Sequence, residues 1–195
     1  MRLVINLVLV AIVAFLVYAL YSSIREPIAF KTEKERRERQ VIDKLMKIRT
    51  AQEAFRDITG EFASDFDTLA EVLETGDFKI IKVIGDPDDP DFTGEITYDT
   101  VFQPAADSMR TVLRINNFDS LRYIPFTRGG TFDISANVID YQSTEVPVVE
   151  VGTPRSTFMG PWADPRFARY DQDYDPSEPI KFGNLYAPNL SGNWE

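Results

Sequence analysis

The beginning of the chain differs from the rest because it consists almost wholly of apolar side chains. Residues 3–24 form a run of 22 residues without a charged side chain. At about 1.5 Å per residue, a helix of this length extends roughly 33 Å, which is enough to cross the hydrocarbon core of a bilayer. The run is too long for a secretory signal peptide, and no small-residue cleavage site follows it. The sequence therefore predicts an uncleaved transmembrane anchor.

The residues after the anchor predict two further helices. Pro27 is expected to end the membrane helix, because proline lacks a backbone N–H and restricts the residue before it. An amphipathic stem helix follows, with apolar residues at steps of three and four, and Gly60 is expected to end it. A shorter helix is then predicted to begin at Ser64 or Asp65, either of which can cap it, and to end at Gly76.

Beyond the second helix the apolar pattern acquires a period of two, which indicates β-strands. Turn sequences rich in Gly, Pro, Asp and Asn separate the candidate strands. These strands cover residues 79–84, 96–102, 111–115, 121–124, 131–134, 138–141 and 147–151. After residue 151, Pro, Gly, Asp and aromatic residues dominate, so we expect an irregular segment that covers the folded part.

The predicted fold class is α+β. It comprises an N-terminal transmembrane helix, an amphipathic stem helix, a short second helix and an antiparallel β-sheet. We expect four parts along the chain: the transmembrane anchor 1–24, a juxtamembrane linker and stem helix 25–60, an α+β head 61–151, and an irregular C-terminal segment 152–195 that covers the head.

Composition restricts the chemistry that this chain can perform. The 195 residues include no Cys and no His. Their absence excludes disulfides, thiolate nucleophiles, zinc or haem ligation through these side chains, and a Ser-His-Asp relay. A net charge of −10 argues against nucleic-acid binding. We therefore expect a protein that is not an enzyme and that carries no cofactor, apart from the calcium ion considered below.

Charge is divided unevenly between the stem and the head. Residues 25–60 contain 10 Lys and Arg against 7 Asp and Glu, whereas residues 61–195 contain 10 against 24. Basic residues beside a membrane span favour the cytoplasmic side, but glutamates alternate with them here and long domains are translocated regardless of charge. The charge pattern therefore leaves the topology open. A basic neck also suits anionic headgroups or the acidic loops of a partner.

The C-terminal segment contains a candidate calcium site. Asp171, Asp173 and Asp175 stand at alternate positions, as carboxylates do at the start of many Ca²⁺-binding loops. A proline and a phenylalanine occupy the positions where an EF-hand requires Gly and Glu, so an EF-hand is excluded. A looser site that includes Glu178 and a solvated acidic loop both stay open. The same two alternatives apply to an acidic turn formed by Asp86, Asp88, Asp89 and Asp91.

Other residues are candidates for contact with a partner protein. Ala19 and Ser23 stand four positions apart in the span, as small residues do where two membrane helices pack. Asn6 can donate a hydrogen bond to a neighbouring helix. Three alternatives stay open: Ala19 and Ser23 face lipid, Asn6 meets interfacial water, and the charged start of the stem is solvated. Aromatic residues and arginines crowd the C-terminal segment, which is typical of interfaces but equally of a segment that covers its own sheet. The complete set of candidates is Asn6, Ala19, Ser23, Arg36, Arg37, Arg39 and Trp194.

Residues 48–69, with the sequence IRTAQEAFRDITGEFASDFDTL, resemble the end of the stem helix in type IV pilins and type II secretion pseudopilins. In those proteins an Arg-x-Ala-x-x-Ala-Tyr/Phe stretch leads to Gly-x-Tyr/Phe and a short helix with an aspartate-rich start. The resemblance implies a pilin-like lollipop. However, no acidic residue precedes Glu26, whereas pilins carry a glutamate early in the mature chain, and Pro27 is expected to interrupt the stem. The resemblance therefore concerns the fold rather than fibre formation.

The chain is also similar to a family of uncharacterised single-pass envelope proteins. The similar segments are Pro27–Phe30, Ile48–Gln52, Gly60–Phe62, Ser64–Leu69, Ile124–Phe126 and Gly192–Glu195. This resemblance implies an anchor in the bacterial inner membrane, a periplasmic head and a role as accessory subunit of ExbB/ExbD/TonB-like ion-driven transport systems. A pilin-like or pseudopilin-like assembly subunit and a periplasmic head that senses Ca²⁺ or another ligand stay open as alternatives.

Overall fold

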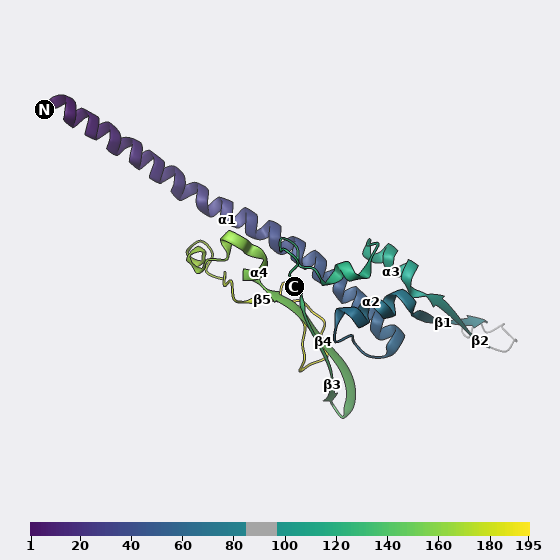
Figure 1. Cartoon of the computed structure of the whole chain (residues 1–195). Helices are drawn as coiled ribbons and strands as arrows, with labels where there is room; N and C mark the ends of the chain where they lie inside the picture. The colour runs from purple at the N-terminus through teal and green to yellow at the C-terminus, as the bar shows by residue number, and fades with distance from the viewer. Residues whose placement is uncertain (85–96) are drawn as a thin grey trace, which may run out of the picture.

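The computed structural model describes residues 1–84 and 97–195 and shows one long helix whose second half carries a head of short helices and strands (Figure 1). The helix α1 spans Arg2–Thr59. The head contains helices α2 (Phe66–Thr75), α3 (Ala105–Leu113) and α4 (Arg155–Met159), and strands β1 (Asp77–Ile84), β2 (Thr97–Pro104), β3 (Asp133–Tyr141), β4 (Thr144–Pro154) and β5 (Pro179–Gly183). Short 3₁₀ turns lie at Phe118–Arg122, Gly160–Trp162 and Pro165–Arg169. The α+β class, the apolar N-terminal helix and the small antiparallel sheet are thus confirmed.

Helix α1 continues through Pro27, so the predicted break at this residue is wrong. Its 58 residues extend roughly 87 Å. An interior proline costs about 3 kcal/mol because one backbone hydrogen bond is lost and the ring crowds the preceding turn. The residues on either side compensate, since Phe30 is fully buried and the Glu26 carboxylate accepts a hydrogen bond from Tyr170. The helix ends at Gly60, as predicted, in the left-handed conformation with φ 90°.

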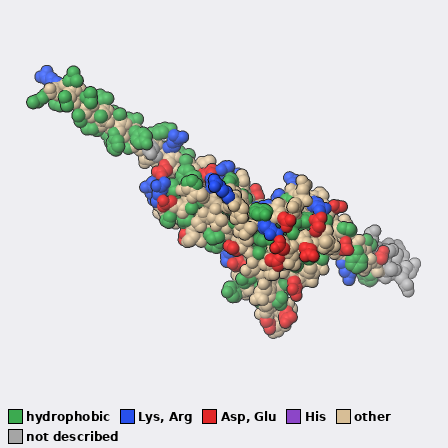
Figure 2. Space-filling view, viewed as in Figure 1, with side chains coloured by type: hydrophobic (Ala, Val, Ile, Leu, Met, Phe, Trp, Pro, Cys, Tyr) green, Lys and Arg blue, Asp and Glu red, His purple; other side chains and the backbone are tan. Residues whose placement is uncertain are grey.

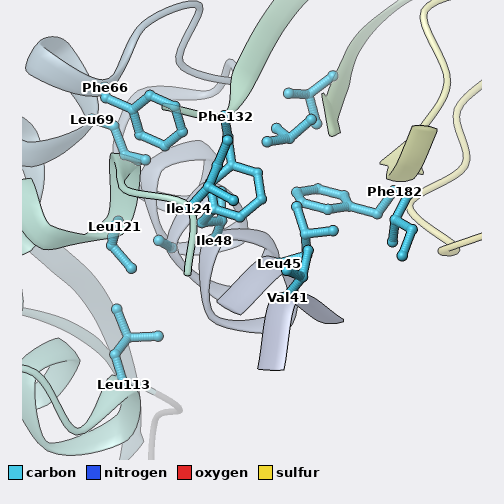
Figure 3. Packing of buried hydrophobic residues seen from close by; sticks show 14 of the residues in the cluster. Val41, Leu45, Ile48, Phe66, Leu69, Leu113, Leu121, Ile124, Phe132 and Phe182 are labelled. Carbon is cyan, nitrogen blue, oxygen red and sulfur yellow. The ribbon is translucent and has the colours of Figure 1, made fainter. Parts of the chain in front are cut away.

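The second half of α1 passes through the core of the head. The predicted apolar stripe is buried, with Val41, Leu45, Ile48 and Ala51 fully inaccessible to solvent. Figure 3 shows three of these side chains in one cluster with residues from the helices and strands around them. A single helix, α1, therefore contains both the exposed apolar segment and the central part of the core of the head.

Local hydrogen bonds fix the turn that leads from α1 into α2. Asp65 caps α2 by accepting a hydrogen bond from the Thr68 N–H at 2.7 Å, and Gly76 follows the last helical residue, as predicted. Gln52 is fully buried and makes two hydrogen bonds with the backbone of Ala63, at 3.0 and 2.9 Å. This side chain therefore holds the turn against α1.

The strands form two separate antiparallel sheets. β1 and β2 make a two-stranded ribbon, and β4 lies between β3 and β5 in the second sheet. The described parts of the strands predicted at 79–84, 96–102, 138–141 and 147–151 lie in β1, β2, β3 and β4. The strand predicted at 131–134 is partly correct, because residue 131 makes only an isolated bridge and β3 begins at residue 133.

Two predicted strands are wrong, and the C-terminal segment is more regular than expected. Residues 111–115 belong largely to α3, in which Ala105, Met109 and Leu113 are buried at the four-residue spacing of a helix. Residues 121–124 begin in a 3₁₀ turn. The C-terminal segment contains α4, two 3₁₀ turns and β5, which pairs with the end of β4. Short elements of this kind carry too few periodic positions to be recognised from their pattern alone.

Candidate interaction surface

The first part of α1 exposes its apolar side chains on all sides. This segment is long and apolar enough to span a membrane, and none of it is buried against the head. Figure 2 shows it as an apolar rod that projects from the rest of the molecule. The candidate contact residues Asn6, Ala19 and Ser23 are all exposed on this rod. At about 100° per residue, Asn6 lies roughly 140° around the helix from Ala19, so these residues do not form one face.

Phe30 lies at the centre of an aromatic cluster where the rod enters the head. Its ring stacks on Phe167, with centroids 5.0 Å apart and planes at 6°, and meets the edge of Tyr174 at 4.9 Å. Trp162 and Tyr170 complete the cluster at 6.0 and 6.3 Å. Of the two interpretations of this aromatic-rich segment, the structure supports the one in which these four side chains cover their own chain. We call these five residues the Phe30 cluster.

Burial also changes the acidity of one member of the Phe30 cluster. The pKa of Tyr174 is raised to about 12, chiefly by desolvation and further by the nearby Glu38 carboxylate. The phenol donates a hydrogen bond to the Trp162 carbonyl at 2.7 Å, and the raised pKa preserves this donor into the alkaline range. This bond links the two ends of the segment that covers Phe30.

Polar contacts fasten the same C-terminal segment to the first turns of α1 beyond the span. The Lys34 ammonium donates to Asp171 at 2.6 Å, and Tyr170 donates to Glu26 at 2.7 Å. The Lys34 hydrogen bond lowers the pKa of the Asp171 carboxyl. These partners are separated by more than 130 residues along the chain. The C-terminal segment therefore lies directly beside the end of the apolar span.

The four acids of the candidate calcium site do not converge, and three of them have other partners. Asp171 is bound to Lys34, and Asp175 accepts hydrogen bonds from the N–H and hydroxyl of Ser177 at 2.8 and 2.6 Å. Glu178 pairs with Arg155 at 2.8 Å, and Asp173 is exposed. In residues 1–84 and 97–195, no three side chains of metal-binding type gather in one place. The second acidic segment, 86–91, lies outside the described residues.

The candidate arginines of the stem divide into two kinds. Arg36 and Arg37 both lie 5.0 Å from the centroid of the Phe126 ring and both donate to Glu33. These hydrogen bonds lower the pKa of Glu33 to about 2. Arg37 also donates to a backbone carbonyl of α4 at 2.6 Å, which makes it a structural residue of the head. Arg36 is half-exposed and Arg39 is exposed, so both stay accessible to a partner.

The C-terminus docks onto its own chain. Trp194 is partly buried and packs against the core. Arg49 donates to the Glu195 side chain at 2.7 Å and to the Leu190 carbonyl at 3.3 Å. The candidate contact residue Trp194 thus packs against its own chain. The stem segment and the C-terminal segment quoted for the envelope-protein resemblance meet at the Arg49–Glu195 pair.

Sequence reasoning missed the residues that attach the C-terminal segment to the span. Glu26, Phe30 and Lys34 lie between the predicted span and the apolar stripe of the stem, and their partners come from the far end of the chain. The sequence signal was an apolar Phe30 directly before the charged start of the stem. Its burial partners could not be identified from one sequence.

No protein-family model, curated protein or solved structure matches this chain. Two features of the molecule bear on its function: the exposed apolar segment, and the continuation of the same helix into the core of the head.

Proposed function

We propose that this chain is a single-pass protein of the bacterial inner membrane with a periplasmic head. In this proposal it is not an enzyme but a structural, accessory subunit of a multiprotein envelope complex. An ion-driven, energy-transducing ExbB/ExbD/TonB-like transport system is the candidate complex that we favour. The observation that carries the proposal is the continuity of α1, which begins as an exposed apolar rod and ends inside the core of the head.

An unbroken helix makes the span and the head one mechanical unit. The stem buries its apolar stripe in the head, and the Phe30 cluster braces the helix where the span ends. A displacement of the span by a neighbouring membrane helix is therefore passed to the head without a hinge at Pro27. The polar Asn6 in an otherwise apolar segment and the small residues Ala19 and Ser23 offer contacts for such a neighbour.

Isolation of the intact protein with its partners tests this proposal. The tagged full-length chain is extracted from its native membrane in mild detergent, and co-purifying proteins are measured by quantitative mass spectrometry. We expect channel subunits of the ExbB or ExbD type to be enriched with the wild type. Ala19→Leu should lower their recovery because it fills the small-residue face, whereas Ala14→Leu, about 140° around the helix, should not. Recovery of the tagged chain alone would contradict the proposal.

A pilin-like assembly subunit is the second candidate function. The continuity of α1 across Pro27 favours it, because an uninterrupted stem removes one of the two differences from pilins. This function requires the chain to polymerise through its apolar rod. Negative-stain electron microscopy of the full-length protein, released from membranes by shearing, should then show filaments. Dispersed particles at every protein concentration would exclude this candidate.

A further inference from the structure

A groove lies on α1 where the apolar rod meets the head. It has a volume of about 280 Å³ and is lined by Tyr18, Tyr21, Arg25, Glu26 and Ala29. Most of these residues follow one another at steps of three and four, so they form a stripe along one face of the helix. One end of the groove is aromatic and the other is charged. We call it the junction groove.

One guanidinium group, that of Arg25, lines the charged end of the junction groove, and a second, that of Arg169, is bound to the Glu26 carboxylate of the same end. Arg25 lies 5.8 Å from the centroid of the Tyr21 ring, and no carboxylate of the described residues forms a salt bridge with it. Arg169 reaches the same end because it pairs with Glu26 at 3.2 Å, while 57% of its side chain stays exposed. Figure 2 shows basic side chains gathered where the rod enters the head. This end of the groove therefore presents hydrogen-bond donors that still face solvent.

The depth of the junction groove relative to a bilayer follows from the span. Arg25 directly follows the last residue of the uncharged run, while Tyr21 and Tyr18 lie one and two helical turns earlier. This order places the arginine at the level of lipid phosphates and the tyrosine rings at the boundary with the acyl chains. Guanidinium groups bind phosphate oxygens through paired hydrogen bonds.

We propose that the junction groove binds an anionic phospholipid. Its phosphate lies between Arg25 and Arg169, and its glycerol and upper acyl chain lie along the rings of Tyr21 and Tyr18. This inference rests on the proposed insertion of the span in a membrane. The remainder of the head repels anionic lipid, since residues 61–154 carry 18 acidic against 6 basic residues. The lipid is therefore held at this one end of the head.

The lipid that stays bound to the full-length protein tests this inference. The protein is reconstituted in equimolar phosphatidylcholine and phosphatidylglycerol, transferred to mild detergent, and its retained lipid is quantified by mass spectrometry. We expect the wild type to be enriched in phosphatidylglycerol. The Arg25→Gln, Arg169→Gln double variant should lower the retained ratio of phosphatidylglycerol to phosphatidylcholine. The expected decrease is about fivefold for each arginine removed, because a basic residue near an anionic surface is worth about 1 kcal/mol. No enrichment in the wild type, or equal enrichment in the double variant, would overturn the inference.

Controls separate this site from general electrostatics and from a free phosphate site. The Lys79→Gln, Arg114→Gln variant has the same net charge as the double variant, but its changes lie in β1 and after α3, far from the span (Figure 1). It should retain the enrichment. Displacement of the lipid by soluble glycerol phosphate would indicate a site for free phosphate and overturn the inference. Flotation of the protein with vesicles tests insertion of the span. If the protein floats but shows no preference for anionic lipid, only this inference is refuted. If it does not float, the proposed function is refuted as well.

Discussion

Replacement of Phe30 by alanine should detach the C-terminal segment from the stem. The side chain is fully buried and its main neighbours are Trp162, Phe167, Tyr170 and Tyr174 of that segment. Phe-to-Ala substitutions in a core cost about 3–5 kcal/mol, because transfer energy is lost and a cavity is left. The aromatic pairs add roughly 0.5–1.5 kcal/mol each where their geometry is good. The substitution should therefore weaken the attachment of the C-terminal segment to α1 and leave the stability of the rest of the head nearly unchanged.

Hydrogen exchange of the full-length protein in micelles measures this local effect. A loss of about 3–5 kcal/mol raises the opening equilibrium by roughly two to three and a half orders of magnitude, at 1.4 kcal/mol per factor of ten. We expect faster exchange over residues 162–175, with little change in the buried part of α1 around Leu45 and Ile48. In a Trp194→Phe background, the emission of Trp162 should also shift to longer wavelength as its ring becomes hydrated.

A neighbouring residue supplies the control for this experiment. Ile28 lies on the same turn of α1 but is 60% exposed, so Ile28→Ala should leave exchange over residues 162–175 unchanged. If Phe30→Ala left this exchange unchanged as well, the packing described for the Phe30 cluster would be wrong. If it accelerated exchange equally in every part of the head, the segment would not be a separate unit of stability.

Three further predictions concern single side chains. Gln52→Leu leaves the buried N–H and carbonyl of Ala63 unpaired, so chemical denaturation should show a loss of roughly 2–4 kcal/mol in the free energy of unfolding; a loss near zero would contradict the role of this clamp. The pKa of Glu33 is about 2 in the folded state against 4.5 ordinarily, so its stabilising contribution is complete above pH 4.5 and is lost as the pH falls toward 2. Glu33→Gln should remove this acid dependence of the free energy of unfolding, worth about 1 kcal/mol after solvent screening. Parallel curves of this free energy against pH for variant and wild type would refute the pairing of Glu33 with Arg36 and Arg37. Because Asp171 is already bound to Lys34, Ca²⁺ should not change the Tm of EDTA-treated protein, and a rise of several degrees would restore the calcium-site hypothesis.

Features that depend on a few neighbouring residues could be predicted from the sequence. Asp65 caps α2 because its carboxylate accepts a backbone hydrogen bond, and Gly60 ends α1 because glycine adopts a positive φ at little cost. Gly76 follows α2 at a position where a Cβ would crowd the Val72 carbonyl. The apolar stripe of the stem could be predicted because its spacing repeats over several turns. The exposed span could be predicted for the same reason, from an uninterrupted apolar run.

Features that depend on distant residues could not be predicted. Pro27 indicates a helix break by its own chemistry, but the contacts of Glu26 and Phe30 with the C-terminal segment hold the helix together. Residues 111–115 have the β-branched and apolar composition of a strand, yet packing selects a helix through Met109 and Leu113. The candidate contact residue Arg37 was recognised by charge, but its partners in α4 and near Phe126 are supplied by the fold.

The position of the head against the membrane tests the account most directly, and the two tryptophans report it. Trp162 contacts Phe30, six residues or roughly 9 Å beyond the span, whereas Trp194 lies near Arg49, about 38 Å beyond it. The full-length protein is reconstituted in vesicles whose lipids carry a quencher on the headgroup, with either Trp194→Phe or Trp162→Phe leaving one reporter. The account predicts strong quenching of Trp162 and little quenching of Trp194. Equal quenching of both, or of neither, would contradict a head carried on an unbroken helix directly beside the bilayer.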